Sequence, residues 1–224
     1  MEISPIAYYR GPFGSKFGIP RQSSVIQDIE GSIVFEPAFR SPDAVRGLEG
    51  FDWLWLVWGF SANDVNEPFH ATVRPPRLGG NRTIGVFASR SPFRPNSLGL
   101  SSVRLSSIEF DAPSGPVLHI LGADLMNGTP IYDIKPYIRF SDSHPDARDG
   151  FVGENNWESL EVVFPDNAGS YFSDRELEVL RQTLSLDPRP RVQHDASKVY
   201  GFPFAGHEVR FTVSGNTLEV TSID

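Results

Sequence analysis

Hydrophobic residues make up 39% and charged residues 21% of the 224-residue chain, a balance that allows one or two packed domains and excludes wholesale disorder. The net charge of -8 gives little general attraction to nucleic acid, and the lack of cysteine excludes disulfides, thiolate metal sites and cysteine nucleophiles. The chain contains no run of 18 apolar residues, so no membrane span is predicted, and residues 1–10 lack the pattern of a signal peptide. We therefore expect a cytoplasmic protein.

Short strands are predicted throughout the first two-thirds of the chain. The expected strands are residues 3–9, 32–35, 53–60, 83–88, 98–108 and 117–121. In the run at 53–60, both the odd-numbered and the even-numbered residues are apolar, which predicts a strand buried on both sides. The sequence Ser-Pro-Asp from Ser41 predicts a short helix that ends near Gly47 or Gly50.

A change of composition divides the chain. Residues 141–156 are rich in Ser, Asp, Asn and Gly, which predicts a linker or an exposed loop. We therefore expect a mainly β protein, with a small β-barrel domain at residues 1–145 and a smaller α+β domain at residues 146–224.

The C-terminal part carries the clearest local patterns. Ser173 and Glu176 have the spacing of a capping box, and leucines at helical spacing follow, so a helix is predicted at 174–184. Alternating residues at 207–213 and 217–222 flank a Gly-Asn dipeptide, which predicts a hairpin.

One segment is strongly basic although the whole chain is acidic. From Arg74 to Arg104 there are six arginines and no Asp, Glu or Lys, and four prolines stiffen the backbone. Arginines on a stiff frame lose less entropy when they bind an anion such as phosphate. Surface ion pairing is the other explanation, because a charge run alone is weak support for a binding site.

A second polar cluster is predicted further along the chain. Asp133, Lys135 and Tyr137 follow a turn at Asn127 and Gly128, and alternate residues of an extended segment share one face. A carboxylate, an ammonium and a phenol on one face suit a polar site, but a solvated strand edge with one ion pair explains them too. The histidines are scattered without metal-ligand spacing, so no metal is expected.

Three long segments, residues 17–22, 72–101 and 124–137, resemble the TsaA-like family of tRNA methyltransferases. The similarity is close over residues 3–142 and looser to the end of the chain. It implies a small β-barrel, S-adenosylmethionine as cofactor and a homodimer. It also implies methylation of N6 of threonylcarbamoyl-adenosine at position 37 in the tRNA anticodon loop.

The resemblance implies a set of cofactor residues. These are Pro20, Arg21, Gln22, Ser61, Ala62, Arg90, Leu100, Met126, Asn127, Gly128 and Thr129. Relatives often have His in place of Ser61 and Asp in place of Asn127, and the amide keeps a hydrogen-bond acceptor but loses the charge.

Methyl transfer from a sulfonium needs accurate positioning, and the accepting N6–H must lose a proton. We expect Asp133 or Tyr137 to take that proton, and Lys135 to orient the threonylcarbamoyl carboxylate or a phosphate. The arginines predicted to contact RNA are Arg74, Arg77, Arg94, Arg189 and Arg191.

Two kinds of alternative stay open. The chain could be a methyltransferase of the same family that acts on another RNA or on a small molecule. It could also be a barrel that binds an adenosyl ligand or RNA without chemistry.

Overall fold

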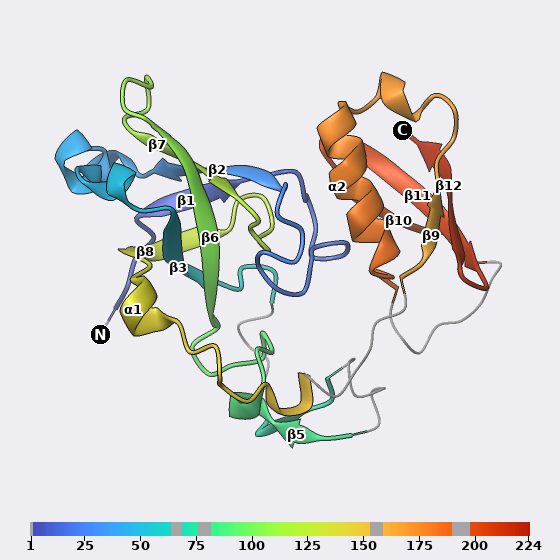
Figure 1. Ribbon diagram of the computed structural model, residues 1–224, viewed down its shortest axis with the longest axis horizontal. Helices are drawn as coiled ribbons and strands as arrows, with labels where there is room; N and C mark the ends of the chain where they lie inside the picture. Colours follow the sequence, from blue (N-terminus) through green and yellow to red (C-terminus); the bar gives the residue numbers. More distant parts are fainter. Residues whose placement is uncertain (1, 64–68, 76–81, 153–158, 190–197) are drawn as a thin grey trace.

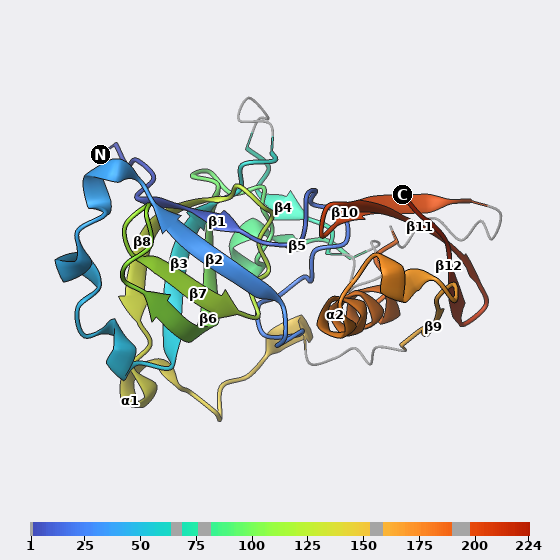
Figure 2. The same cartoon turned by 90° about the horizontal axis from the view of Figure 1, so that it is seen from above.

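Two units lie side by side in the computed structural model, which describes residues 2–63, 69–75, 82–152, 159–189 and 198–224 (Figure 1 and Figure 2). The first is a closed barrel in the order β1-β2-β7-β6-β3-β8, which confirms the predicted mainly β fold. Its strands are β1 (Ala7–Arg10), β2 (Glu30–Phe35), β3 (Trp53–Gly59), β6 (Leu98–Glu109), β7 (Val117–Leu121) and β8 (Pro130–Pro136). Two short strands, β4 (Thr72–Val73) and β5 (Ile84–Gly85), pair with each other outside the barrel.

Strand β3 shows how the sequence builds the barrel. Leu54, Leu56 and Trp58 point inward and are buried, whereas the alternate residues Trp55 and Val57 are only half-buried. The prediction of a strand buried on both sides was therefore wrong. Trp55, on the outer face, is half-buried and packs against the ring of Tyr137 at 5.7 Å between centroids.

Several predicted elements are shorter or of another type. The helix expected from Ser41 is two 3-10 turns, η2 (Pro42–Val45) and η3 (Leu48–Gly50), separated by Gly47 with φ +90°. The strand expected at 83–88 is only β5, because η5 (Val86–Ala88) follows it directly. Among the described residues, the remaining short helices are η1 (Pro37–Phe39), α1 (Arg139–Asp142), η6 (Gly150–Val152) and η7 (Ala168–Ser170).

The second unit packs one helix on a sheet of order β10-β11-β12-β9. The elements are β9 (Glu161–Val163), α2 (Asp174–Ser185), β10 (Tyr200–Phe204), β11 (His207–Ser214) and β12 (Thr217–Ile223). The predicted capping box is confirmed, since Ser173 Oγ accepts from the Glu176 N–H and Glu176 accepts from the Ser173 N–H. The predicted β11–β12 hairpin is confirmed too.

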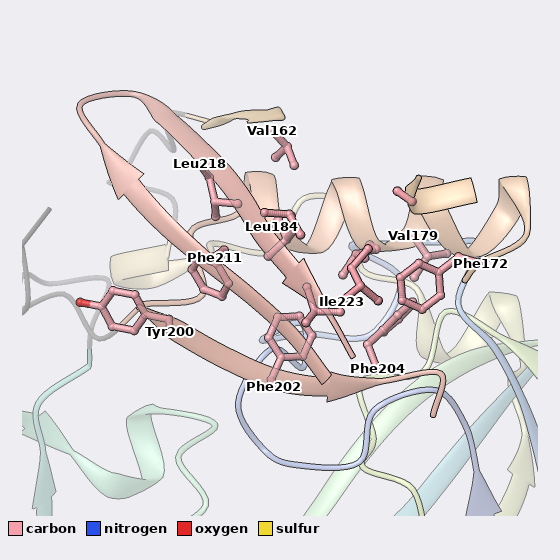
Figure 3. Close-up of a cluster of buried hydrophobic side chains, with 14 of the residues drawn as sticks. Val162, Phe172, Val179, Leu184, Tyr200, Phe202, Phe204, Phe211, Leu218 and Ile223 are labelled. Atoms are coloured by element: carbon pink, nitrogen blue, oxygen red, sulfur yellow. The ribbon is translucent and has the colours of Figure 1, made fainter. Parts of the chain in front are cut away.

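The core of the second unit includes a loop of the first (Figure 3). Phe13, Ile26 and Ile29, from the loop between β1 and β2, are buried with α2 and β10–β12. Phe13 packs against Phe204 at 5.4 Å between ring centroids, and the Ala205 N–H donates to the Pro12 carbonyl at 2.8 Å. Phe13, Ile26 and Ile29 therefore belong to the core of the second unit, although they precede β2 in the chain. The predicted boundary between residues 145 and 146 stays a prediction.

No helix in the described part of the chain is long and apolar enough to cross a membrane.

Candidate functional site

Three connections meet at one end of the barrel. Strands β1, β3 and β7 end there and β2, β6 and β8 begin there, because neighbouring strands are antiparallel. The connections are residues 11–29, 60–97 and 122–129, and all the predicted cofactor residues except Leu100 lie in them. Leu100 is the third residue of β6, on the exposed outer face. The fold thus gathers segments that are about a hundred residues apart in the sequence.

Arg90 links two of these connections. Its guanidinium donates a hydrogen bond to Gln22 Oε1 at 2.5 Å, across 68 positions of sequence. The same loop is tied to the third connection, since the Ser24 N–H donates to the Gly122 carbonyl at 2.8 Å. Within this loop Pro20 is buried, whereas Arg21 is exposed. The predicted cofactor residues Gln22 and Arg90 are therefore held together.

Asp124 is a candidate site residue that the sequence did not reveal. Its Oδ1 accepts a hydrogen bond from Ser101 Oγ at 2.6 Å, and Ser101 Oγ accepts from Trp58 Nε1 at 3.0 Å inside the barrel. Burial raises the pKa of Asp124, although the Ser101 hydrogen bond and the positive charge of Arg90 oppose that rise. A half-buried carboxylate with a raised pKa beside Arg90 is typical of a functional site.

Tyr9 lies next to this carboxylate. Its hydroxyl is fully buried and makes no hydrogen bond with the described residues. Burial raises the pKa of Tyr9, and the negative charge of Asp124 raises it further. The ring fits because β2 has Gly31 beside it, where a Cβ would lie 2.3 Å from the Tyr9 ring.

The turn at residues 126–129 is fixed by the end of β1. The Gly128 N–H donates to the Tyr9 carbonyl at 2.8 Å, and the Asn127 N–H donates to the Phe13 carbonyl at 2.7 Å. The Asn127 side-chain oxygen accepts from the Gly11 N–H at 3.4 Å. Asn127 therefore uses its amide to hold the β1–β2 loop, a task that needs an acceptor but no charge. Half-buried Met126 and buried Thr129 flank these two residues.

Ser61 and Ala62 follow β3 and are exposed. The Phe60 N–H donates to the Ser97 carbonyl at 2.9 Å, which places both residues beside the start of β6. They are thus at the same end of the barrel as Arg90.

Two of the three proposed catalytic residues lie on β8, and Tyr137 directly follows it. Asp133 and Lys135 share the outer face, as their spacing predicts, and form an ion pair of 2.8 Å between side chains that are 46% and 65% exposed. Val57 pairs with both Leu100 and Asp133, so Asp133 lies two strands from Leu100, about 10 Å away.

Tyr137 is not brought to the cofactor residues. It lies four residues beyond Asp133, about 13 Å further along the strand direction. Its N–H donates to the Trp53 carbonyl at 2.9 Å, and its ring packs on Trp55 at the opposite end of the barrel. The indole of Trp55 in turn donates to Asp142 at 2.9 Å. We therefore give Tyr137 no part in the proton transfer proposed below.

Arg189 has a structural partner that the sequence did not indicate. Its guanidinium is 9% exposed and donates two hydrogen bonds to Asp187, at 2.8 and 2.9 Å. Burial raises the pKa of Asp187, but the hydrogen bonds and charge of Arg189, with the charge of Arg21, outweigh it and lower the pKa overall. Because its donors are engaged and covered, Arg189 is dropped from the RNA contacts expected above.

The other predicted RNA contacts have different surroundings. Arg74 is exposed, whereas Arg94 donates to the carbonyls of Ser89 and Val86 at 2.7 and 3.3 Å. Arg77 and Arg191 lie outside the described residues.

The groups gathered at this end fit an adenosyl amino acid. Arg90 supplies a fork of donors for a carboxylate, and Asp124 and Asn127 supply acceptors for an ammonium or for hydroxyls. Leu100 supplies an exposed apolar surface for a purine ring. Among the described residues, no group of three His, Asp or Glu side chains could hold a metal ion.

A separate cavity of about 320 Å³ lies between the two units. It is lined by Gly11, Asp28, Glu30 and residues of α2. Arg175 crosses it to form ion pairs with Glu30 and, at 3.9 Å, with Asp28. None of the predicted site residues lines it, and its ion pairs join the units.

Comparison with known proteins gives a consistent picture. Residues 8–143 match the family described as the tRNA-methyltransferase O N-terminal domain, and residues 158–224 match the TrmO C-terminal domain. The tRNA (adenine(37)-N6)-methyltransferase of Escherichia coli K12 is 34% identical over 100% of this chain and 97% of its own. A putative S-adenosylmethionine-dependent methyltransferase of Pseudomonas aeruginosa, RcsF, is 38% identical over 85% of this chain and 83% of its own. The crystal structure of TrmO from Pseudomonas aeruginosa superposes with a TM-score of 0.78 at 28% identity, covering 100% of this chain and 98% of that one.

Proposed function

Because the chain belongs to the tRNA-methyltransferase O family, we propose that it transfers a methyl group from S-adenosylmethionine to N6 of the adenine at position 37 of tRNA. One observation carries the assignment to this site. Three distant segments converge at one end of the barrel, where Arg90 reaches Gln22 and lies beside Asp124. A barrel that binds an adenosyl ligand without chemistry is disfavoured, because relatives that match nearly the whole chain are named as methyltransferases.

The finer details belong to the proposal. We infer that the accepting adenosine carries a threonylcarbamoyl group, whose carboxylate Lys135 would orient on the outer face of the barrel. A homodimer and a cytoplasmic location are also part of the proposal. Sedimentation velocity of the purified protein tests whether it is a dimer. A single monomeric species would contradict the proposed homodimer.

The residues of the chain divide the work by their chemistry. S-adenosylmethionine, when bound, supplies a methyl group activated by a sulfonium. Arg90 would hold its carboxylate, and Asp124 and the turn at Asn127 would accept hydrogen bonds from its other polar groups. Asp133, whose side chain is half-exposed, would take the proton that N6 releases.

Asp133→Asn should lower the turnover number by about tenfold or more, because the amide cannot accept the N6 proton. The affinity for S-adenosylmethionine should stay near that of the wild type. Radiolabelled methyl transfer to tRNA and calorimetry with the cofactor measure the two quantities. Glu109→Gln is a matched control, since Glu109 is also an exposed acid paired with a basic side chain, His119, on the barrel wall. An unchanged turnover for Asp133→Asn would leave Asp133 with a structural role only.

The proposed function is tested most directly on tRNA from cells. Mass spectrometry of tRNA nucleosides, with and without this protein, should reveal a methylated adenosine at position 37 only where the protein is present. Transfer of label to tRNA with and without the threonylcarbamoyl group decides which adenosine is the substrate. If the label enters a small molecule or another RNA instead, the chain is a methyltransferase of the same family with a different substrate.

A further inference from the structure

An exposed aromatic pair lies on the connection between β3 and β6. The side chains of Phe69 and Phe87 are 55% and 71% exposed, although both are large and apolar. Their rings lie 6.4 Å apart between centroids and are 27° from parallel. The segments that carry them are joined by the β4–β5 pair, so the stack is fixed by a backbone ladder. Exposed apolar rings held in this way indicate a surface that meets a partner.

A positive charge lies beside the pair. The guanidinium of Arg94 lies 5.7 Å from the centroid of the Phe87 ring, and its hydrogen bond to the Ser89 carbonyl fixes it there. The chain has no acidic residue and no lysine from Arg74 to Arg104. A polyanion with flat, apolar rings complements such a surface better than an acidic or a neutral peptide would.

The pair also adjoins the proposed cofactor site. Phe87 belongs to η5, and Arg90, which bonds Gln22, is only three residues further on. Figure 1 shows η5 and β5 at the end of the barrel where β6 begins, on the side away from the β6–β7 turn.

We propose that Phe69 and Phe87 form a stacking platform for one unpaired base of the tRNA anticodon loop, next to the methyl donor. Loops of RNA are recognised through splayed bases that stack on aromatic side chains, while arginines neutralise the phosphates. The proposal rests on the proposed function, because it takes an RNA loop as the substrate. It adds a specificity element that would hold the loop open while one adenine is methylated.

The test uses an RNA hairpin with the sequence of an anticodon stem-loop and 2-aminopurine in place of the adenine at position 37 or of its neighbours. The fluorescence of 2-aminopurine falls when the base stacks. The wild-type protein should quench it at one or more of these positions. Phe87→Ala should lose most of the quenching and bind the hairpin about tenfold more weakly, whereas Phe87→Tyr should keep both. Phe110→Ala is a matched control, because Phe110 is an exposed ring in the β6–β7 turn at the other end of the barrel.

Two outcomes would overturn the platform. Equal affinity and quenching for Phe87→Ala and the wild type would show that no base stacks there. A change in the sedimentation of the free Phe87→Ala protein, with hairpin affinity intact, would show that the rings meet a second copy of the chain instead. Calorimetry with S-adenosylmethionine reports that the variant is folded. A failure of the proposed function is seen separately, as a wild-type protein that transfers no methyl group to tRNA.

Discussion

Arg90→Ala is expected to weaken the binding of S-adenosylmethionine by about tenfold to a hundredfold, the range for a lost hydrogen bond to a charged group. Arg90 would hold the carboxylate of the cofactor, and it joins the loop of residues 11–29 to the connection between β3 and β6. Gln22→Ala should cause part of the same loss, because Gln22 only orients the guanidinium. Isothermal titration calorimetry of the purified variants measures these affinities.

Arg104→Ala is the control for this experiment. Arg104 lies in the same acid-free segment and is exposed, but it pairs with Trp53 far along β6 from the site. Its loss should leave the affinity for the cofactor unchanged. If Arg90→Ala binds the cofactor as tightly as the wild type does, Arg90 is not part of the site.

Asp187→Asn should lower the free energy of unfolding by about 2 kcal/mol at pH 7, because it leaves the buried guanidinium of Arg189 without its carboxylate. Asparagine tolerates the left-handed backbone that Asp187 adopts, with φ +50°, so the loss reports the interaction rather than strain. Urea denaturation measures it. Asp166→Asn, an exposed acid in the same unit, is the matched control and should change stability little.

The same pair predicts a pH dependence. The pKa of Asp187 is lower in the folded protein than in the unfolded chain, where it is about 3.9. Its contribution is therefore complete above that value and is lost as the pH falls through the lower, folded pKa. The stabilities of wild type and Asp187→Asn should differ at pH 7 and pH 5 and should converge below about pH 4. A difference that stays constant down to acid unfolding would mean that the carboxylate charge is not the cause.

The features that could be predicted from the sequence are those fixed by neighbours in the chain. The capping box at Ser173 and Glu176 and the β11–β12 hairpin depend on contacts within a few residues, and both are present. The strands at 98–108 and 117–121 were predicted because apolar alternation follows the pleat of a single strand. Many such strands together predict a barrel, but they do not predict the order of the strands around it.

The site could be predicted only in part, because burial and distance are set by the whole fold. Because alternate residues of a strand share a face, the sequence predicts that Asp133, Lys135 and Tyr137 lie on one face. It does not predict how far each residue lies from the loops at the end of the barrel. Tyr137 therefore shares their spacing but lies at the end of the barrel opposite the predicted cofactor residues. Asp124 was missed because a single acid after a strand has no pattern, and its hydrogen-bond partner Ser101 comes from another strand.

The participation of residues 11–29 in the C-terminal core sets an order of events during synthesis. Phe13, Ile26 and Ile29 leave the ribosome before β10, β11 and β12, which bury them. Until those strands fold, the loop that carries Gln22 lacks the packing that holds it beside Arg90. Completion of the cofactor site is thus a late event. A chain that terminates before β10 would contain every proposed catalytic residue but would lack the strands that bury Phe13, Ile26 and Ile29.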